Sequence, residues 1–304
     1  FMERDNIIIG SRGSKLALIY AENVKAKLKE VFSKSIEIKK IVTSGDENQK
    51  DRLSSLGGKG LFSKKIEKEL IEKKIDIAVH ALKDMPSEEP EGLITNCFLE
   101  RNDPREVLIS KNNNQIINLK TNSVIGTSSL RREYQLKRIR NDLKYKLIRG
   151  NVDTRINKLN DDLYDAIILS YAGLKSLNID KQISQIFSTQ EIIPSVGQGV
   201  IALQCRKNDK HTLELLSKIN HEKTSISVNA ERYFLKVLEG DCETAVGAFA
   251  YVENDVINLN AELFSIDGKQ RFYHHSKKDI MLSKELGLEV GGILKKVSKD
   301  SYKR

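Results

Sequence analysis

Short apolar runs alternate with amphipathic stretches along the first two thirds of the chain, which predicts strands that alternate with helices. Residues 7–9 and 75–79 are mostly apolar, as is typical of strands covered on both faces of a sheet. Between these runs, helical spacing places Ile66, Leu70 and Ile71 on one face of a helix. Parallel α/β sheets are the expected result.

The region from about residue 103 to 193 repeats this pattern. We expect strands at residues 124–126, 146–148 and 166–169, each followed by a helical stretch. The last of these strands and its helix weakly echo residues 75–83, since both have an Asp-containing strand followed by Ala and Leu-Lys. The echo predicts two similar α/β domains.

The last third of the chain follows a different plan. A helix is expected from about residue 224 to 238, then alternating segments typical of strands, then a final helix at about 283–297. This order predicts an α+β domain. The expected domains are residues 1–99 together with about 194–219, residues 103–193, and residues 224–304.

Composition is compatible with packed cores, because 39% of the residues are hydrophobic and 31% are charged. No apolar run approaches the roughly 20 residues that a membrane-spanning helix needs. The first residues lack the pattern of a signal peptide, so we expect a soluble, cytoplasmic protein. Cys97, Cys205 and Cys242 lie far apart without a C-x-x-C pair, which argues against a disulfide framework and a structural zinc site. No metal is expected.

The formal net charge of +9 suggests nucleic acid as a ligand class. Many lysines, however, alternate with glutamates, as in residues 64–74, which is typical of a solvated helix face. Stacking aromatic residues are sparse around the arginines, with only Tyr134 and Tyr145 nearby. Nucleic-acid binding is therefore a minor alternative.

Arginines gather at two expected strand–helix junctions. Residues 127–129 open a helix that continues with Arg131 and Arg132, and Arg149 and Arg155 flank the next junction. A helix N-terminus offers free N–H groups and the positive end of a dipole, which favour anions. A capped helix with a solvated basic face explains either junction equally well. Two such junctions in one domain favour a ligand with several negative charges.

Three further segments carry candidate chemistry. Arg12 and Ser14 follow the first strand, where they form either an anion-binding junction or an ordinary capped helix start. Asp84 follows the strand at 75–80, and ligands bind beyond the carboxyl ends of strands in open α/β sheets. A turn aspartate before Met-Pro is the alternative. Cys242 lies in a polar loop that leaves a thiol available for chemistry, although lone cysteines are often buried packing residues.

Five strings of residues closely resemble porphobilinogen deaminases, in the order and spacing of that family and over nearly the whole chain. They are VHALKDMP at 79–86, GTSSLRR at 126–132, RGNVDTR at 149–155, VGQGVIALQCR at 196–206 and AERYFLKVLEGDC at 230–242. The resemblance implies two α/β domains similar to type II periplasmic binding proteins. It also implies a C-terminal α+β domain that carries a cofactor on a cysteine.

The resemblance further implies a transferase of tetrapyrrole (haem) biosynthesis. Porphobilinogen loses ammonia to give an electrophilic azafulvene, which the free α-carbon of the growing chain attacks. Four additions onto a covalent dipyrromethane primer give a hexapyrrole, and hydrolysis releases hydroxymethylbilane. The family resemblance favours a monomer. A non-catalytic anion-binding protein of the periplasmic type is the alternative, but it gives no reason for Cys242 in its loop.

The family's functional positions map onto this chain residue by residue. Asp84 matches the catalytic carboxylate, which hydrogen-bonds pyrrole N–H groups and stabilises developing positive charge. Cys242 matches the residue that bears the dipyrromethane cofactor through a thioether. The remaining matches bind carboxylates of the cofactor (Lys83, Ser129, Arg131, Arg132) or of the substrate (Arg12, Ser14, Arg149, Arg155), and Lys59 matches a mobile loop of the active site.

Three residues depart from the family pattern. Ile19-Tyr20 stands where Trp-Gln is usual, so a hydrogen-bonding amide is replaced by a phenol. Ala81 stands where a serine usually follows the histidine, and Ser176 stands where an arginine commonly follows Gly-Leu-Lys. None of these departures removes Asp84 or Cys242, so we expect activity to be retained.

Overall fold

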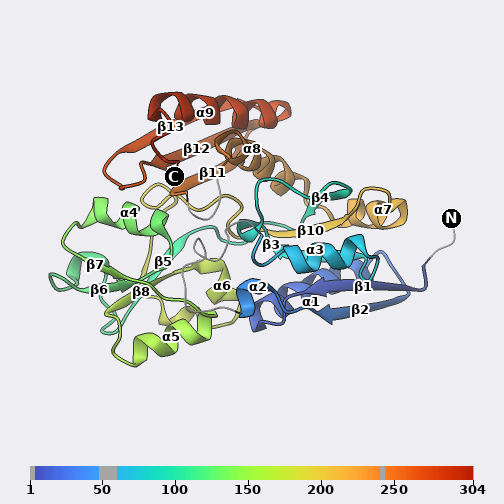
Figure 1. Ribbon diagram of the computed structural model, residues 1–304, viewed down its shortest axis with the longest axis horizontal. Helices are drawn as coiled ribbons and strands as arrows, with labels where there is room; N and C mark the ends of the chain where they lie inside the picture. Colours follow the sequence, from blue (N-terminus) through green and yellow to red (C-terminus); the bar gives the residue numbers. More distant parts are fainter. Residues whose placement is uncertain (1–3, 48–59, 240–243, 304) are drawn as a thin grey trace.

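The computed structural model describes residues 4–47, 60–239 and 244–303. Within these residues, three β-sheets each pack with their own helices, and each sheet with its helices is called a unit below (Figure 1). The third unit lies across the ends of the other two, which lie side by side (Figure 1). No helix in the described ranges is both long and apolar enough to cross a membrane.

The first unit contains a mixed five-stranded sheet. Strands β2, β1 and β3 are parallel, and β10 enters antiparallel between β3 and β4. Helices α1 and α7 cover one face and α3 the other, so the strands are buried on both sides. The bounds are β1 (Asn6–Ser11), α1 (Lys15–Lys29), β2 (Ser35–Lys40), α2 (Ser44–Glu47), α3 (Lys64–Ile71), β3 (Ile77–Ala81), β4 (Leu93–Phe98), β10 (Ile201–Arg206) and α7 (Lys210–Ile219).

The second unit repeats this plan. Strands β7, β6 and β8 are parallel, and β5 enters antiparallel between β8 and β9. The expected pair of similar α/β units is therefore confirmed. The bounds are β5 (Glu106–Ser110), β6 (Val124–Gly126), α4 (Leu130–Ile139), β7 (Lys144–Lys146), α5 (Val152–Asn160), β8 (Ala166–Ser170), α6 (Tyr171–Ser176) and β9 (Gln185–Ile186).

One expected strand of the second unit is wrong in position. The sequence predicted a strand at 146–148, but β7 ends at Lys146. Ile148 is buried among the core residues of this unit, although it lies in a loop. The carbonyl of Leu147 accepts a hydrogen bond from the Tyr164 hydroxyl at 2.7 Å rather than from a strand. Gly150 follows with a φ of 114°, a conformation that favours glycine.

The third unit is an antiparallel three-stranded sheet with two long helices on one face. Asn254 and Asp255, both with positive φ, form the tight turn between its first two strands. Gly287 of the last helix permits a close approach, because a Cβ there would lie 2.3 Å from the carbonyl oxygen of Ala230. The bounds are α8 (Glu222–Leu238), β11 (Val246–Glu253), β12 (Val256–Phe264), β13 (Arg271–Asp279) and α9 (Ser283–Ser298), and short 3₁₀ turns lie at η2 (Leu82–Asp84), η3 (Ile116–Asn118), η4 (Asp180–Gln182) and η5 (Ile280–Leu282).

Two segments, residues 99–105 and 194–200, connect the first and second units. They lie side by side, since the backbone N–H of Asn102 donates to the carbonyl of Gly199 at 2.8 Å. A Cβ at Gly199 would lie 2.7 Å from the Asn102 carbonyl oxygen, and its φ is 83°. A glycine is therefore required at this close crossing.

The carboxylate of Glu231, on α8, joins both connecting segments to the third unit. It is fully buried and binds the guanidinium of Arg101 at 2.6 and 3.2 Å. It also accepts the backbone N–H groups of Gly197 at 2.8 Å and Ala250 at 2.9 Å. Four hydrogen bonds thus compensate the desolvation of one charge.

We expect Glu231→Gln to lower the free energy of unfolding by about 3–5 kcal/mol, because the substitution leaves the charge of Arg101 buried without its partner. Urea denaturation followed by fluorescence or circular dichroism measures this loss. Glu239→Gln is the matched control: its carboxylate is 67% exposed and lies 3.5 Å from Lys303, and such surface pairs contribute about 1 kcal/mol or less. Equal losses in the two variants would contradict the assigned role of Glu231.

Candidate active site

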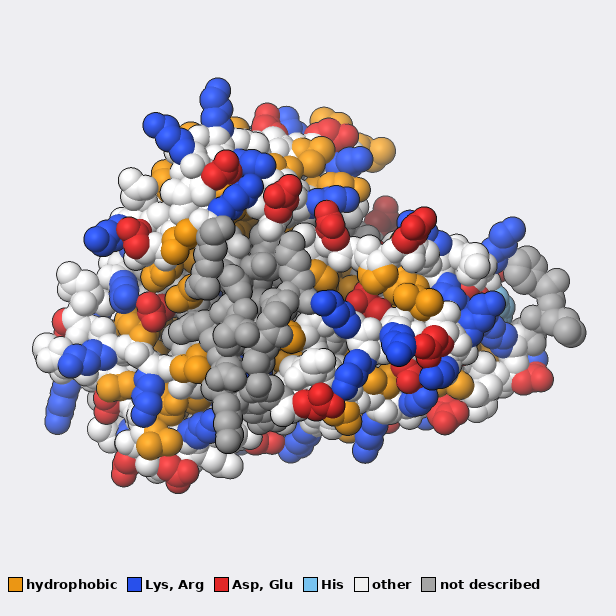
Figure 2. Space-filling model, in the orientation of Figure 1, with side chains coloured by type: hydrophobic (Ala, Val, Ile, Leu, Met, Phe, Trp, Pro, Cys, Tyr) orange, Lys and Arg blue, Asp and Glu red, His pale blue; other side chains and the backbone are white. Residues whose placement is uncertain are grey.

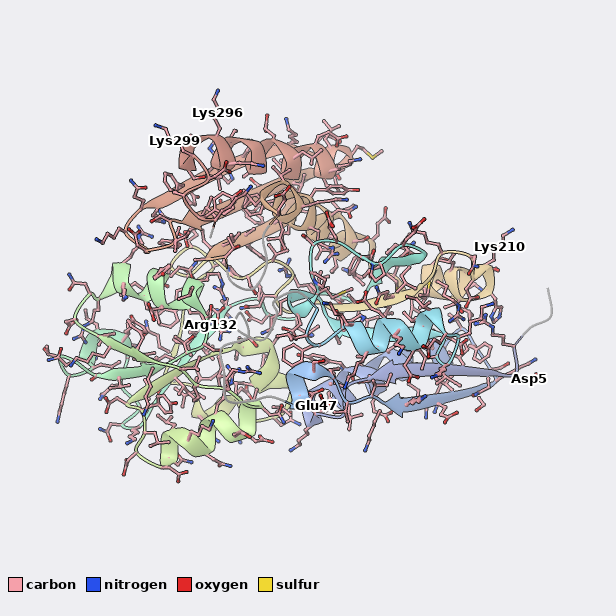
Figure 3. All side chains as sticks on the ribbon, viewed as in Figure 1. Asp5, Glu47, Arg132, Lys210, Lys296 and Lys299 are labelled. Carbon is pink, nitrogen blue, oxygen red and sulfur yellow. The ribbon has the colours of Figure 1, made fainter. Side chains whose placement is uncertain are left out.

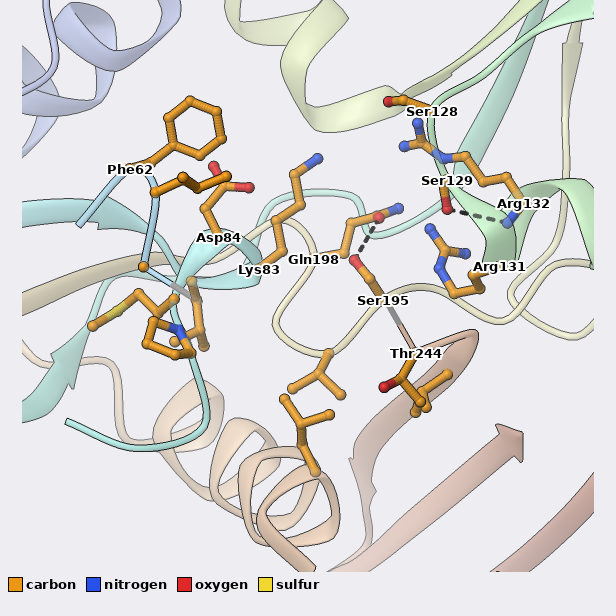
Figure 4. Close-up of a pocket in the computed structure, with 18 of the residues that line it drawn as sticks. Phe62, Lys83, Asp84, Ser128, Ser129, Arg131, Arg132, Ser195, Gln198 and Thr244 are labelled. Atoms are coloured by element: carbon orange, nitrogen blue, oxygen red, sulfur yellow. Dashed lines mark hydrogen bonds between the residues drawn. The ribbon is translucent and has the colours of Figure 1, made fainter. Parts of the chain in front are cut away.

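Three cavities of about 260, 340 and 90 Å³ meet where the units come together. Lys83 and Asp84 line all three of them. Figure 4 shows these two residues on one side of the 260 Å³ cavity, with Ser128, Ser129, Arg131 and Arg132 on the other. The lining of the 260 Å³ cavity includes Lys83 and Asp84 from the first unit, Ser129, Arg131, Arg132 and Arg155 from the second, and Arg232 and Thr244 from the third.

Asp84 is held by the turn that ends β3. Leu82 anchors this turn: its side chain is buried, its N–H donates to Val200, and its carbonyl accepts from Met85. A Cβ at Gly197 would lie 2.6 Å from Leu82, so the second connecting segment packs directly on the anchor. Among the described residues, the half-buried carboxylate of Asp84 has no hydrogen-bonding partner. It is therefore available to a ligand.

Lys83 projects into the cleft from the same turn. Its side chain is open to the cleft, and no described residue bonds its ammonium group. Although Lys83 is exposed to the cleft, desolvation by the surrounding protein, then the charge of Arg132, lowers its pKa to about 8. The ammonium form still predominates at neutral pH, so Lys83 can bind a carboxylate.

Arg131 and Arg132 line the opposite wall and share one buried carboxylate. Arg131 binds Glu106 at 2.7 Å, and Arg132 binds its other oxygen at 2.9 Å. Although burial opposes ionisation, the charges of Arg132 and Arg131 lower the pKa of Glu106 to about 2. Among the described residues, the buried Nε of Arg132 has no hydrogen-bond acceptor. Two guanidiniums are thus held rigidly with a net charge of about +1.

Three further arginines extend the basic lining. Arg155 bonds the Gly150 carbonyl at 2.9 Å, and burial, then the charges of Arg132 and Arg149, lower its pKa to about 10. Arg149 is buried and reaches the Gly45 carbonyl of the first unit at 3.5 Å. Arg12 forms an ion pair with Asp46 and lies 4.0 Å from the centre of the Phe62 ring.

The predicted serines act as helix caps beside the cleft. Ser14 accepts the N–H of Ala17 at 3.3 Å and begins α1. Ser129 accepts the N–H of Arg132 at 3.2 Å and begins α4 (Figure 4). Both residues also line the cavities, so capping and ligand binding are compatible in the same side chains.

The structure thus brings together the predicted residues that it describes. Figure 3 shows Arg132 in the interior, whereas Lys210, Lys296 and Lys299 project outward from the helices. Cys242 and Lys59 lie outside the described residues. Their nearest described neighbours, Thr244 and Gly60, both line the 260 Å³ cavity.

Two of the departures from the family pattern meet in the structure. Tyr20 on α1 and Ser176 at the end of α6 are joined by a side-chain hydrogen bond between the first and second units. Burial and the charge of Asp84 raise the pKa of Tyr20 to about 12, so its hydroxyl stays protonated. Tyr20 and Ala81 both line the 90 Å³ cavity.

The sequence analysis missed Glu106, the residue that orients Arg131 and Arg132. A signal was present, because an acidic residue begins the otherwise apolar run of β5 and is fully buried there. Gln198 and Arg232, which line the 260 Å³ cavity, were also missed. Nothing in their local pattern distinguishes them from surface residues.

As far as the described residues show, the site is a cleft with more cationic than anionic side chains, and the carboxylate of Asp84 is not hydrogen-bonded by any of them. Such a cleft can bind a ligand with several carboxylates and place one part of it against Asp84. Within the described ranges, no group of three or more His, Cys, Asp or Glu residues is arranged to hold a metal ion.

Among solved structures, the chain is similar to the methionine-binding protein MetQ, with 12% identity, a TM-score of 0.45, and coverage of 75% of this chain and 92% of that one. The periplasmic VFT2 domain of BvgS from Bordetella pertussis has 12% identity and a TM-score of 0.44, with coverage of 71% and 86%.

Comparisons of sequence are much closer. The family model described as porphobilinogen deaminase, dipyromethane cofactor binding domain, matches residues 7–214, and the model of the C-terminal domain matches residues 225–296. Porphobilinogen deaminases of Alkaliphilus metalliredigens and Staphylococcus carnosus are each 42% identical over 95% of this chain and cover 92% and 94% of their own lengths. That of Geobacillus kaustophilus is 45% identical over 88% of this chain and 87% of its own. The chain therefore belongs to the porphobilinogen deaminase family.

Proposed function

We propose that this chain is a hydroxymethylbilane synthase, which deaminates four porphobilinogen molecules and joins them head to tail on a covalent dipyrromethane primer. The observation that carries the proposal is the position of Asp84, a carboxylate that no described residue hydrogen-bonds, where three cavities meet opposite a wall of guanidinium groups. A polymer of pyrroles with acetate and propionate side chains needs both features: many cations for its carboxylates and one anion for the reacting ring.

The residues of the cleft fit a dipyrromethane. Its carboxylates match the ammonium group of Lys83, which no described residue bonds, and the guanidinium of Arg132, which lines the same cavity. Thr244 lines the same cavity, and Cys242 is two residues away, within about 7 Å along an extended chain. We assign Cys242 as the thioether anchor. When bound, the dipyrromethane supplies the free α-carbon that reacts with the first substrate.

A second group of basic side chains is assigned to the substrate. Arg12, Arg149 and Arg155 line the 340 Å³ cavity together with Ser14, so they can hold the acetate and propionate groups of porphobilinogen. Because this cavity opens onto Asp84, carboxylate binding places the aminomethyl end of the substrate near the catalytic carboxylate. Lys59 belongs to the same proposal, since its neighbour Gly60 lines the cleft.

Asp84 acts at the step in which ammonia leaves. Positive charge then develops on the pyrrole, and a fixed carboxylate in a partly enclosed cleft stabilises it without reorganising. The same carboxylate can accept the proton that the ring loses after coupling. Glu106 keeps Arg131 and Arg132 in place, so that the product's carboxylates do not draw these side chains away from the wall.

The competing functions have less support. A basic stripe for nucleic acid would lie on the surface, but Arg131, Arg132 and Arg149 are buried in the cleft. On the face shown in Figure 2, basic and acidic side chains are interspersed. A pure anion-binding protein leaves the unpartnered Asp84 unexplained. The division into domains at residues 1–99 with 194–219, 103–193 and 224–304 is part of the proposal, and the cytoplasmic monomer stays a prediction.

Asp84→Ala should lower turnover of porphobilinogen by at least about 100-fold, the usual cost of removing one preorganised electrostatic group. The measurement is hydroxymethylbilane formation by purified holoenzyme, with circular dichroism to show that the fold is retained. Asp5→Ala is the control, since its carboxylate is 93% exposed at the far end of the first unit (Figure 3). Wild-type turnover in Asp84→Ala would defeat the assignment.

The intact mass of the purified protein tests the anchor. A mass excess equal to a dipyrromethane is expected in the wild type and absent in Cys242→Ala. Cys97→Ala serves as the matched control and should keep the excess, because burial raises the pKa of the Cys97 thiol to about 12 and leaves it inert. An excess that disappears with Cys97 instead would contradict Cys242 as the anchor.

The lowered pKa of Lys83 can be tested in Cys242→Ala, where no cofactor carboxylate can neutralise the ammonium group. The neutral amine should increase as the pH rises through about 8, whereas an ordinary lysine has a pKa near 10.4. Brief acetylation at a series of pH values, read by peptide mass spectrometry, should therefore label Lys83 with a midpoint near pH 8. Labelling in parallel with the exposed Lys296 would show that the cleft does not desolvate Lys83.

A further inference from the structure

A chain of buried polar side chains lies behind the turn that carries Asp84. His80, on β3, is 6% exposed, and its Nε2 lies 2.7 Å from the Oε1 of Gln204 on β10. The amide nitrogen of Gln204 donates to Glu67 at 2.7 Å and to Glu89 at 3.1 Å. Four side chains from separate elements of the first unit are thus connected.

This chain determines which nitrogen of His80 carries hydrogen. The two carboxylates can only accept, so they fix the NH₂ group of Gln204 toward themselves and its carbonyl oxygen toward His80. A carbonyl oxygen accepts, so Nε2 of His80 must donate to it. In the neutral ring the other nitrogen, Nδ1, is then an acceptor.

The ring is neutral at physiological pH. Burial lowers the pKa of His80 to about 4, although the bond to Gln204 and the charge of Asp84 act in the opposite direction. Arg232 contributes a smaller effect in the same direction as burial. His80 therefore presents a lone pair on Nδ1 and adds no positive charge to the cleft.

His80 borders one of the cavities of the site. His80 lines the 90 Å³ cavity together with Tyr20, Ala81 and Asp84. No described residue bonds Nδ1. Nδ1 is also not among the polar side-chain atoms that are sealed from solvent without a partner. The carboxylate of Asp84 and the imidazole of His80 thus border one small cavity, together with the cations Arg12 and Lys83. The two acceptors suit a ligand group rich in N–H donors, and the cations suit its carboxylates.

We propose that His80 contacts the substrate: Nδ1 accepts a hydrogen bond from an N–H of porphobilinogen, from the ring or the aminomethyl group, where that part of the substrate enters the cavity beside Asp84. Glu67, Glu89 and Gln204 are positioning residues, since they act only by fixing the tautomer and orientation of His80. The inference rests on the proposed function. A neutral ring is essential to it, because an imidazolium would repel the substrate's ammonium group.

Two substitutions separate contact with the substrate from support of the fold. The amide of glutamine reaches the position of Nε2, so His80→Gln keeps a donor to Gln204 and loses the acceptor at Nδ1. The shorter amide of asparagine reaches the position of Nδ1, so His80→Asn keeps an acceptor there and leaves the carbonyl of Gln204 without its donor. His274→Gln, on β13 of the third unit, is the control for loss of a histidine.

Kinetics with porphobilinogen and thermal unfolding should be measured on each holoenzyme, after intact mass has shown the cofactor to be present. We expect His80→Gln to lower kcat/KM about tenfold, as for one lost hydrogen bond, with an unchanged unfolding temperature. His80→Asn should lose less kcat/KM, about threefold, but unfold at a lower temperature. His274→Gln should match the wild type in both.

The opposite pattern would overturn the inference. If His80→Gln has wild-type kinetics, or if kcat/KM falls only in step with the unfolding temperature, His80 supports the fold and does not contact the substrate. A wild-type protein that carries the cofactor but forms no hydroxymethylbilane would instead overturn the proposed function itself. The two failures are therefore distinguishable in one set of measurements.

Discussion

The buried carboxylate of Glu231 joins the parts of the chain from which the cleft is built. Its partners are Arg101 and Gly197 on the two connecting segments, and Ala250 on β11. Each connecting segment continues directly into an antiparallel strand, β5 of the second sheet or β10 of the first. One carboxylate thus sets where both strands enter their sheets, and a displacement there would move both walls of the cleft.

These two antiparallel strands have the same task in their units. In the second unit, β5 carries Glu106, which orients Arg131 and Arg132. In the first, β10 carries Gln204, which orients His80. In each case a buried polar side chain on the inserted strand holds side chains of another element, α4 or β3, in place. The repeated sheet plan therefore positions two guanidinium groups on one side of the cleft and the His80 imidazole on the other.

The periodicity of apolar residues predicted the helices and strands whose positions depend on the local sequence. Apolar alternation predicted strands between the two helices of the last third, where β11, β12 and β13 lie, and the helix expected from residue 283 begins there. The strand expected at 146–148 was wrong because Ile148 is buried by a loop, and burial alone does not require strand pairing. The family resemblance predicted residues that the structure places at the cleft, but spacing could not reveal that Glu106 pairs with arginines 25 and 26 positions away. Such pairings depend on the sheet order, which periodicity does not encode.

The position of β10 also bears on how the chain can fold while it is being made. Within the described residues, β10 is the strand that pairs with β4 and joins it to β3, yet it is synthesised after the entire second unit. The N-terminal part of the chain therefore leaves the ribosome before its sheet can close, although domains commonly fold in order of synthesis. The second unit can complete its own sheet first, since β5 to β9 are contiguous in the sequence. Until β10 emerges, the edge of β4 is unpaired and could pair with another chain. This edge must therefore be protected during synthesis, a need that is absent once β10 is in place.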